Sequence, residues 1–363
     1  MAPVTSCFSD LPDPRGSNAR HKLDEVLFIA LCAVLCGAED CSDMALFGQS
    51  KEPFLRRFLT LPHGIPSHDT FSRIFRHLDP DAFHDHFLTF MSRFAEQVEG
   101  VVAVDGKTLR RSYDRAASQS PLHLVSLWAA DQRLVLGQRA VDEKSNEITA
   151  VPELLKLLSL SGVTVTADAM HCQRALSQQI TEQGGHYALA VKDNQRALFD
   201  DVQFMMETAG AGETHVDSGH GRVESRQATV ITDIDWLQCA HQWPGLKAVG
   251  RITRRRELAD KVSEDVAYYL LSDVVSPERL VEVTRQHWGI ENRLHWVLDV
   301  TMQEDQSRNR RGHGPENLAL LRRLALNVAK LEPSKGSMKG KRKQAGWNDD
   351  YLLSLIRQFA QLR

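Results

Sequence analysis

Two aspartates stand directly after short apolar runs, in positions where their carboxylates could bind a metal ion together. Asp105 follows the run VVAV, and Asp168 follows the run GVTVTA. If these runs are neighbouring strands of one sheet, both side chains emerge at the same edge, where they repel each other unless a cation lies between them. Carboxylate oxygens are hard ligands that favour Mg²⁺ or Mn²⁺. The pattern therefore indicates a divalent-metal site at the ends of two strands.

A third carboxylate, Glu291, lies in a late segment expected to be helical. A metal pair about 3.5–4 Å apart can activate a water or hydroxyl and stabilise the leaving 3′ oxygen of a phosphodiester. Each acid also has a simpler interpretation. Asp105 precedes a glycine, as in many turns, and Asp168 could cap a following helix. Glu291 could pair with His287 or His295, each one helical turn away.

These acids need a sheet to bring them together, and the middle of the chain has the pattern of one. Three strand-like runs come first: VVAVDG, LHLVSLWAA and RLVLGQRAV. A helix, a strand ending at Asp168, a second helix and a fifth strand, HYALAVK, follow. Sequential strands favour an antiparallel meander, and a strand reached through a helix favours a parallel crossover. Ribonuclease-H-like nucleases and integrases use this order of elements.

The predicted fold is α/β: a ribonuclease-H-like mixed sheet flanked by helices, with further elements on both sides. Residues 1–98 form a helical N-terminal domain, because apolar side chains recur there at helical spacing. Residues 99–332 form the α/β domain that carries the acids, with a β-rich insertion at about 205–276, before the helix of Glu291. Residues 333–363 form a basic tail, expected to be mobile, and a short last helix.

Composition excludes several broad classes of protein. The chain of 363 residues is long enough for two domains, and its hydrophobic content of 42% and charged content of 25% are typical of globular proteins. The longest apolar run, residues 26–37, is too short to span a membrane. No basic region precedes an apolar core at the N-terminus, so we expect no secretory signal and a cytoplasmic location.

The six cysteines are too few for a disulfide framework and fit a reducing compartment. Cys32, Cys36 and Cys41 form a cluster that invites a metal interpretation. Two of them lie in an apolar helical stretch, where buried free thiols are common, and no fourth ligand follows at a zinc-like spacing. A structural role is therefore favoured over a zinc site.

Charge is distributed unevenly along the chain. The 44 Lys and Arg against 47 Asp and Glu give a net charge of −3, which excludes a uniformly basic nucleic-acid binder. Residues 283–343 nevertheless hold 13 Lys and Arg against 6 Asp and Glu, a net charge of +7. A basic C-terminal third favours DNA laid along one side of the molecule, with binding that falls steeply with salt. A solvated basic segment with no partner is the alternative.

Six separated motifs contain uncommon combinations of Trp, His, Gly and charged residues: VVAVDGKTLRRSYD, VDEKSNEITAVPELL, TVTADAMHCQ, YALAVKDNQ, GHGRVESR and HWGIENRLHWVLDVTMQED. They occur in the same order in insertion-sequence transposases of the Asp-Asp-Glu (DDE) class, which this chain resembles from about residue 8 to about residue 330. The ISAs-type, H-repeat-associated transposases of bacteria are the group most similar to it. The opening DPRGSNARHKL resembles that family's N-terminal associated domain, which makes residues 1–98 a candidate for binding DNA ends.

The resemblance implies that Asp105, Asp168 and Glu291 are the catalytic, metal-binding triad, with two Mg²⁺ or Mn²⁺ ions as the cofactor. It also implies cleavage at transposon ends, attack of the freed 3′ hydroxyl on target DNA, and a homodimer on double-stranded DNA. Three later acids stay open as the third ligand: Asp299, Glu304 and Asp305. Two other functions stay open as well: an inactive or domesticated relative that binds DNA without cutting it, and a nuclease of the same fold without strand transfer.

The chain departs from related transposases that have a longer signature around the glutamate. Those relatives have Tyr seven residues before it, Arg four before it and Lys seven after it, where this chain has Thr284, His287 and Leu298. His287 can still donate a hydrogen bond to a phosphate. These departures leave the hairpin chemistry of some relatives outside what the resemblance implies.

We call the edge of the sheet at which Asp105 and Asp168 are expected to bind metal ions the metal edge. Cations and amides beside it are candidates for holding the phosphates that flank the cleaved bond. They are Lys107, Arg110, Arg111, Lys192, Asn194 and Gln195, together with His287. The family resemblance adds Arg222, in the basic loop GHGRVESR. Ordinary exposed charge at strand ends is the alternative. Arg254, Arg255 and Arg256 are consecutive, so on a strand they would alternate between its two faces.

Overall fold

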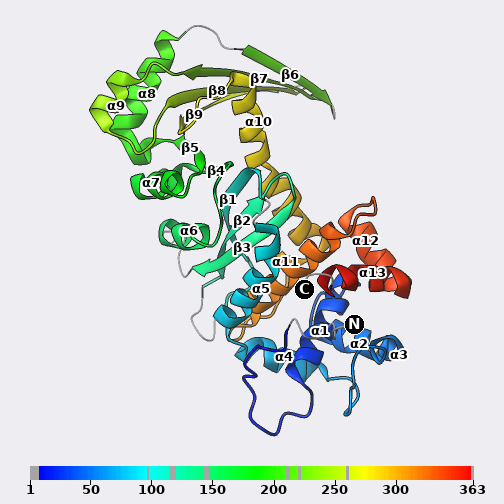
Figure 1. The fold of residues 1–363 in the computed structure, drawn as a ribbon. Helices are drawn as coiled ribbons and strands as arrows, with labels where there is room; N and C mark the ends of the chain where they lie inside the picture. Colours follow the sequence, from blue (N-terminus) through cyan, green and yellow to red (C-terminus); the bar gives the residue numbers. More distant parts are fainter. Residues whose placement is uncertain are drawn as a thin grey trace.

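The computed structural model describes residues 8–95, 98–114, 120–141, 147–209, 213–219, 222–258 and 261–360. These residues form a nine-stranded mixed sheet, with helices on both of its faces and a helical region at one end (Figure 1). Neighbouring strands follow the order β3-β2-β1-β4-β5-β9-β8-β7-β6. The prediction of a mixed α/β fold is confirmed.

The first three strands form an antiparallel meander. They are β1 (Gly100–Thr108), β2 (His123–Ala129) and β3 (Leu134–Val141). Two parallel strands extend the sheet from β1: β4 (Val163–Ala167) and β5 (His186–Val191). Every residue of β2 is buried, because helices cover both faces of this part of the sheet. The five strands have the order and directions expected from the alternation of strand-like and helical runs.

Helices cover both faces of the part of the sheet formed by β1 to β5. Two crossover helices, α6 (Glu147–Leu155) and α7 (Arg174–Glu182), lie on one face. The other face is covered by α5 (Pro80–Ala95), α10 (Pro277–His287) and α11 (Gly314–Leu331), as Figure 1 shows. Helix α10 contacts both β1 and β4. The residues directly after α10, which include Glu291, are thereby brought to the strands that lead to the two aspartates.

Four antiparallel strands continue the sheet beyond β5. They are β6 (Glu213–Gly219), β7 (Arg222–Ile231), β8 (Ala248–Leu258) and β9 (Lys261–Leu271). Helix α8 (Arg196–Thr208) precedes them, and α9 (Asp235–His241) separates β7 from β8. Leu270 of β9 lies opposite Leu189 of β5, so these strands belong to the central sheet rather than to a separate one. The sequence predicts a β-rich segment here but not this attachment.

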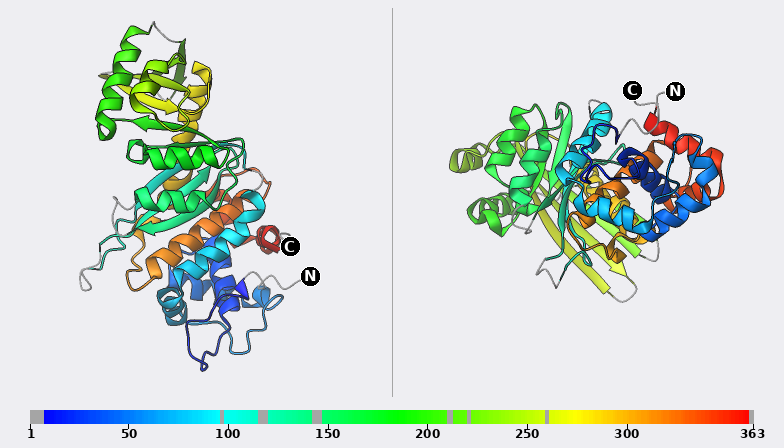
Figure 2. Two further views of the ribbon diagram at one scale, coloured as in Figure 1. Left: turned by 60° about the vertical axis from the view of Figure 1, so that its left-hand side comes forward. Right: turned by 90° about the horizontal axis from the view of Figure 1, so that it is seen from below.

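The N-terminal region is helical, and two of its helices pack against α11. Its helices are α1 (Leu23–Leu35), α2 (Cys41–Ser50), α3 (Glu52–Leu55) and α4 (His68–His77). Ser67 caps α4, since its side chain accepts a hydrogen bond from the Thr70 N–H. Helices α1 and α4 both contact α11, which runs between them and the sheet (Figure 2). Within the described ranges, every helix is too short or too polar to cross a membrane.

The basic C-terminal stretch is a packed helix, so the prediction of a mobile tail is wrong. The chain forms α12 (Met338–Trp347), followed by α13 (Asp349–Ala360). Lys341 donates to the Ala329 carbonyl and Arg342 to the Val34 carbonyl, at the C-terminal ends of α11 and α1. Both cations are buried, because their stems are apolar and their charged ends donate to backbone carbonyls in the last turns of these helices, where the helix dipole favours a cation.

Candidate active site

The pairing of β1 with β4 places the two aspartates side by side. Val104 lies opposite Ala167 in this parallel pair, and Asp105 and Asp168 are the next residues along the chain. Adjacent strands are about 4.8 Å apart, so both carboxylates leave the sheet at the same edge. The Asp105 side chain is 21% exposed and Asp168 is exposed, so solvent and ligands can reach both.

Glu291 reaches the same edge from the segment after α10. That segment is a π-helix, η5 (Glu291–His295), a form that is common at functional sites. His295 Nδ1 lies 3.5 Å from Asp105 Oδ2 and 3.5 Å from Glu291 Oε2. Ligand atoms of these three residues all fall within 4.8 Å of one another. The structure therefore brings Glu291 to Asp105 and adds His295 to the group.

The pKa values at this edge reflect an excess of negative charge. Burial, the charge of Glu291, a hydrogen bond with it and the charge of Asp168 together raise the pKa of Asp105 to about 8. A hydrogen bond from His295 lowers the pKa of Glu291. Without a cation, a proton held between the coupled carboxylates relieves their repulsion. The converging oxygen donors, with one imidazole beside them, fit Mg²⁺ or Mn²⁺.

Comparisons with known proteins identify the family. The family described as "Transposase DDE domain" matches residues 96–328, and the one described as "DDE_Tnp_1-associated" matches residues 5–91. The chain belongs to the DDE transposase family. A protein of Escherichia coli strain K12 named "H repeat-associated putative transposase YhhI" is 35% identical over 363 residues, which covers 96% of each chain. The family indicated by the six sequence motifs is thereby confirmed.

One further relative and one solved structure are also similar to this chain. An "Uncharacterized protein in dhlA 3'region" of Xanthobacter autotrophicus is 46% identical to the transposase over 280 residues, which covers 74% of this chain and 94% of the relative. A solved structure, "Cryo-EM structure of piggyBac transposase synaptic complex with hairpin DNA (SNHP)", matches at 12% identity with a TM-score of 0.46, and the match covers 94% of this chain and 74% of the other.

Lys107 of the transposase, predicted to contact DNA, is buried and paired with acids. Its ammonium donates to Asp299 and lies 3.4 Å from Asp305. These ion pairs tie β1 to the segment after the π-helix, so the placement favours a structural role over a phosphate contact. They also engage two of the acids left open as the third ligand. The remaining one, Glu304, is buried against Arg323 at 2.7 Å.

Asn194 and Gln195 hold the turn that follows Asp168. Asn194 Nδ2 donates to the Ala169 carbonyl at 2.6 Å, and Gln195 Nε2 donates to the Cys172 carbonyl at 3.1 Å. Because both amide groups donate within the protein, they are better suited to positioning the aspartate than to contacting DNA directly. The segment after β5 thus supports the metal edge from the neighbouring strand.

The other predicted cations are placed where DNA could reach them. Lys192 follows β5, and Arg110 and Arg111 follow β1, and all three are exposed. Arg110 lies 3.6 Å from Asp305, but 83% of its side chain remains exposed. Arg222 is the first residue of β7, and its side chain lies outside the described part of the chain. Its contact with DNA stays a prediction.

His287 faces the metal edge from the last turn of α10. Its Nδ1 lies 3.1 Å from Thr166 Oγ1 in β4. Burial lowers the pKa of His287, although the charges of Asp168 and Glu291 oppose the shift. A neutral ring adds no positive charge, and because Nδ1 is already engaged, a contact with a phosphate would use Nε2.

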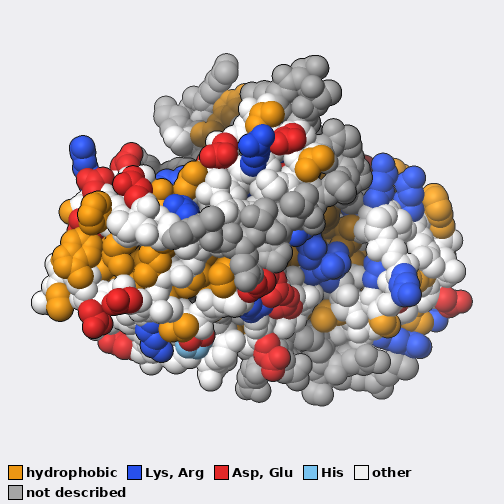
Figure 3. Space-filling view, turned by 90° about the horizontal axis from the view of Figure 1, so that it is seen from above, with side chains coloured by type: hydrophobic (Ala, Val, Ile, Leu, Met, Phe, Trp, Pro, Cys, Tyr) orange, Lys and Arg blue, Asp and Glu red, His pale blue; other side chains and the backbone are white. Residues whose placement is uncertain are grey.

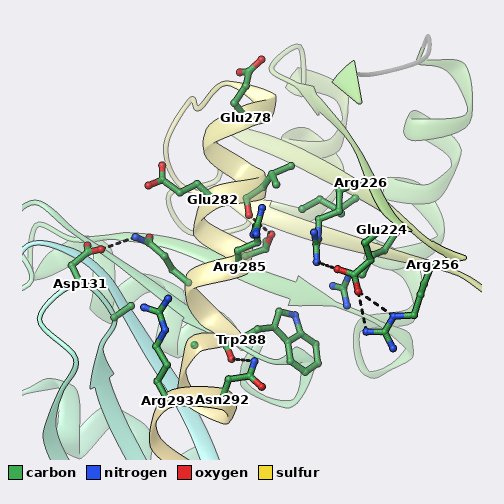
Figure 4. Close-up of a pocket in the computed structure, with 17 residues that line it drawn as sticks. Asp131, Glu224, Arg226, Arg256, Glu278, Glu282, Arg285, Trp288, Asn292 and Arg293 are labelled. Atoms are coloured by element: carbon green, nitrogen blue, oxygen red, sulfur yellow. Dashed lines mark hydrogen bonds and ion pairs between the residues drawn. The ribbon is translucent and has the colours of Figure 1, made fainter. Parts of the chain in front are cut away.

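An open cavity of about 1150 Å³ lies beside Glu291, between α10 and the strands β7 and β8 (Figure 4). Five arginines line it: Arg226, Arg254, Arg256, Arg285 and Arg293. Trp288 is 48% exposed at this cavity, and the Arg254 guanidinium lies 5.4 Å from its ring centre. Arg254 and Arg256 line the cavity but Arg255 does not, in agreement with the predicted alternation along β8. Guanidinium groups beside an exposed indole suit the phosphates and bases of a nucleic acid.

Three residues were not predicted from the sequence: His295 as a member of the metal group, and Trp288 and Arg293 as part of the cavity lining. All three lie in the motif HWGIENRLHW. The four-residue spacing between Glu291 and His295 was the available signal, and it was interpreted as a pair of helix neighbours. The motif alone does not show which side chains face the sheet edge and which face the cavity.

Proposed function

We propose that this transposase holds two divalent cations, Mg²⁺ or Mn²⁺, through Asp105, Asp168 and Glu291, cleaves DNA at insertion-sequence ends and joins the freed 3′ ends to target DNA. The observation that carries the proposal is the meeting of Asp105 and Glu291 at a sheet edge where Asp168 ends the neighbouring strand, and where burial and neighbouring negative charge raise the pKa of Asp105 to about 8. When bound, the ions would activate the attacking water or 3′ hydroxyl and stabilise the leaving oxygen.

The strand order supports a ribonuclease-H-like core for this chemistry. An antiparallel meander continues into two parallel strands; Asp105 lies within the first strand along the chain, and Asp168 directly follows the fourth. We assign residues 99–332 to the catalytic domain and residues 1–98 to a domain that helps to bind DNA ends. The family resemblance favours two copies of the chain on one pair of ends.

The protein's own groups prepare the site for catalysis. His295 Nδ1 is 3.5 Å from both Asp105 and Glu291, and its hydrogen bond to Glu291 keeps that carboxylate ionised. Partial burial of Asp105 strengthens the electrostatic interactions made there and also raises its pKa, so a divalent cation bound at this edge would displace the proton that Asp105 otherwise holds.

We propose that a DNA strand lies along the arginine-lined cavity. Glu224 pairs with Arg226 at 2.6 Å and with Arg256 at 2.9 Å, so its charge offsets part of theirs. Arg293 is exposed, and Trp288 offers a face on which a base can stack. The cavity begins at residues adjacent to Glu291, so a strand bound in it would pass the metal edge.

The decisive experiment combines the purified protein, Mg²⁺ and DNA carrying the element's terminal repeats. We expect Asp105→Asn to reduce cleavage by about 10³-fold, equivalent to about 4 kcal/mol of transition-state stabilisation, because the variant loses one charged metal ligand. DNA affinity measured without metal should stay unchanged. Asp235→Asn, at an exposed acid in α9, is the matched control and should cleave normally.

The same assay separates the other functions. Cleavage without joined products would identify a nuclease, and salt-sensitive binding without cleavage would identify an inactive DNA-binding relative. Wild-type turnover in Asp105→Asn would contradict the assignment of the metal site itself.

A further inference from the structure

A buried carboxylate clamped by two histidines lies next to the strand of Asp105. Glu147, the first residue of α6, is only 2% exposed. His123 Nε2 lies 2.5 Å from Glu147 Oε1, and His171 Nε2 lies 3.1 Å from Glu147 Oε2. Both histidines are buried as well. Each oxygen of the carboxylate therefore has its own imidazole partner.

One side of this cluster is fixed to β1, immediately beyond Asp105. His123 Nδ1 lies 2.7 Å from Thr108 Oγ1, at the end of that strand. A Cβ atom on Gly106 would collide with the carboxylate of Glu147, so the carboxylate packs directly against the glycine. Glu147 thus sets the path of β1 at the residue that follows Asp105.

The other side of the cluster is fixed to the turn that begins with Asp168. His171 is the last residue of this turn, η3 (Ala169–His171). Its bond to Glu147 ties the turn to α6, while Asn194 and Gln195 tie it to the segment after β5. The Glu147 carboxylate therefore connects Gly106, which follows Asp105, to the turn that follows Asp168.

The cluster keeps a charge in a buried position. Burial opposes ionisation of Glu147, but hydrogen bonds from His123 and His171 lower its pKa to about 2. The group is therefore a carboxylate at neutral pH, held rigidly because a buried charge without these partners would be costly. Since both of its oxygens are engaged by histidines, it can affect the metal edge through geometry and not as a ligand.

We propose that Glu147, clamped by His123 and His171, is a positioning residue that sets the spacing of Asp105 and Asp168 for binding divalent cations. This inference rests on the proposed metal-dependent function. It gives a role to Glu147 in the motif NEIT and to His171 in the motif DAMHCQ, where the proposed function uses only Asp168. Removing groups that orient metal ligands typically reduces metal affinity or activity by about 10–100-fold. We expect a loss in this range.

The first test replaces Glu147 by its neutral isostere in the full-length protein. Glu147→Gln keeps the shape but offers one acceptor where two histidines need one each. Mn²⁺ affinity, measured by electron paramagnetic resonance of the free ion, should fall at least about tenfold, and the Mg²⁺ concentration for half-maximal cleavage should rise by a similar factor.

A matched control separates positioning from stability. Glu332 is also buried, its pKa is also lowered to about 2, and its partners, Ser334, Lys341 and Tyr351, lie outside this cluster. Glu332→Gln should lower the melting temperature without changing Mn²⁺ affinity. A variant that affects only folding would behave like this control.

Two substitutions of His171 test whether a hydrogen-bond donor to Glu147 is enough to keep Mn²⁺ affinity. His171→Gln keeps a nitrogen donor that can reach Glu147, and His171→Leu removes it. We expect Mn²⁺ affinity to stay within about threefold of wild type in the first and to fall about tenfold in the second.

The results distinguish failure of this inference from failure of the proposed function. Unchanged Mn²⁺ affinity in Glu147→Gln, or a loss that Glu332→Gln reproduces, would overturn the positioning role alone. A wild-type protein that binds no Mn²⁺, or an Asp105→Asn variant that binds it equally well, would overturn the metal site and this inference with it.

Discussion

Gly106 stands between Asp105, a proposed metal ligand, and Glu147, the carboxylate that packs against the strand. The Asp-Gly pair has a simple interpretation as a turn, but the residues lie inside β1, where the glycine leaves room for a side chain from α6. The absence of a Cβ is therefore as important to the site as the carboxylate beside it.

Replacing this glycine tests that packing at the scale of one residue. Gly106→Ala should lower the free energy of unfolding by about 1–3 kcal/mol, because the new methyl group overpacks against Glu147. Urea unfolding measures the change. The control is Gly289→Ala, where a Cβ would meet no atom within 4 Å, and its stability should be unchanged or slightly higher. Equal stability of the two variants would contradict the contact with Glu147.

The three acids proposed as metal ligands were predicted from the sequence, but the residues that support them were not. Asp105 and Asp168 each follow an apolar run, and Glu291 lies in a recognisable motif. Glu147 and its two histidine partners come from three elements and meet only after the strands and the crossover helix have packed. No local pattern in the chain encodes that meeting.

At the scale of elements, the strands of the meander were predictable because each is a short apolar run bounded by polar residues. Two features were not predictable. The π-helical turns at Glu291–His295 and Val297–Thr301 have no signal in residue spacing. Helix α12 looked like a tail because Lys and Arg were counted as solvated, whereas Arg342 binds carbonyls of both α1 and the second π-helical segment.

Helix α12 therefore offers a test at the scale of an element. Arg342→Gln should lower the free energy of unfolding by about 1.5–3 kcal/mol, because it removes charge-assisted hydrogen bonds to the Val34 and Thr301 carbonyls. Lys339→Gln, at an exposed position of the same helix, should have little effect. Urea unfolding compares the two. Equal stability of both variants and the wild type would restore the interpretation as a mobile tail.

At the scale of the whole molecule, the structure changes the meaning of the charge count. Residues 283–343 have a net charge of +7, but four of their cations are buried: Arg322, Arg323, Lys341 and Arg342. Seen from above, Lys and Arg side chains are densest in the right half of Figure 3, the side on which Figure 1 shows α12 and α13. The excess of positive charge that residues 283–343 expose to solvent is therefore smaller than +7. The path of DNA is better inferred from the cavity beside Glu291.

The salt dependence of DNA binding tests that path. Each phosphate contact that is lost should make the plot of log affinity against log salt concentration shallower by about 0.9 for double-stranded DNA. Arg293→Gln removes an exposed cation from the cavity. It should therefore weaken DNA binding and make the slope shallower by about 0.9, the effect of one lost phosphate contact. Fluorescence anisotropy in an Asp105→Asn background measures binding without turnover. Lys156→Gln, at an exposed lysine paired with Glu153 beyond the end of α6, should leave the slope unchanged. If Arg293→Gln also leaves it unchanged, the DNA does not follow the cavity, and the cations exposed after β1 and β5 become the next candidates.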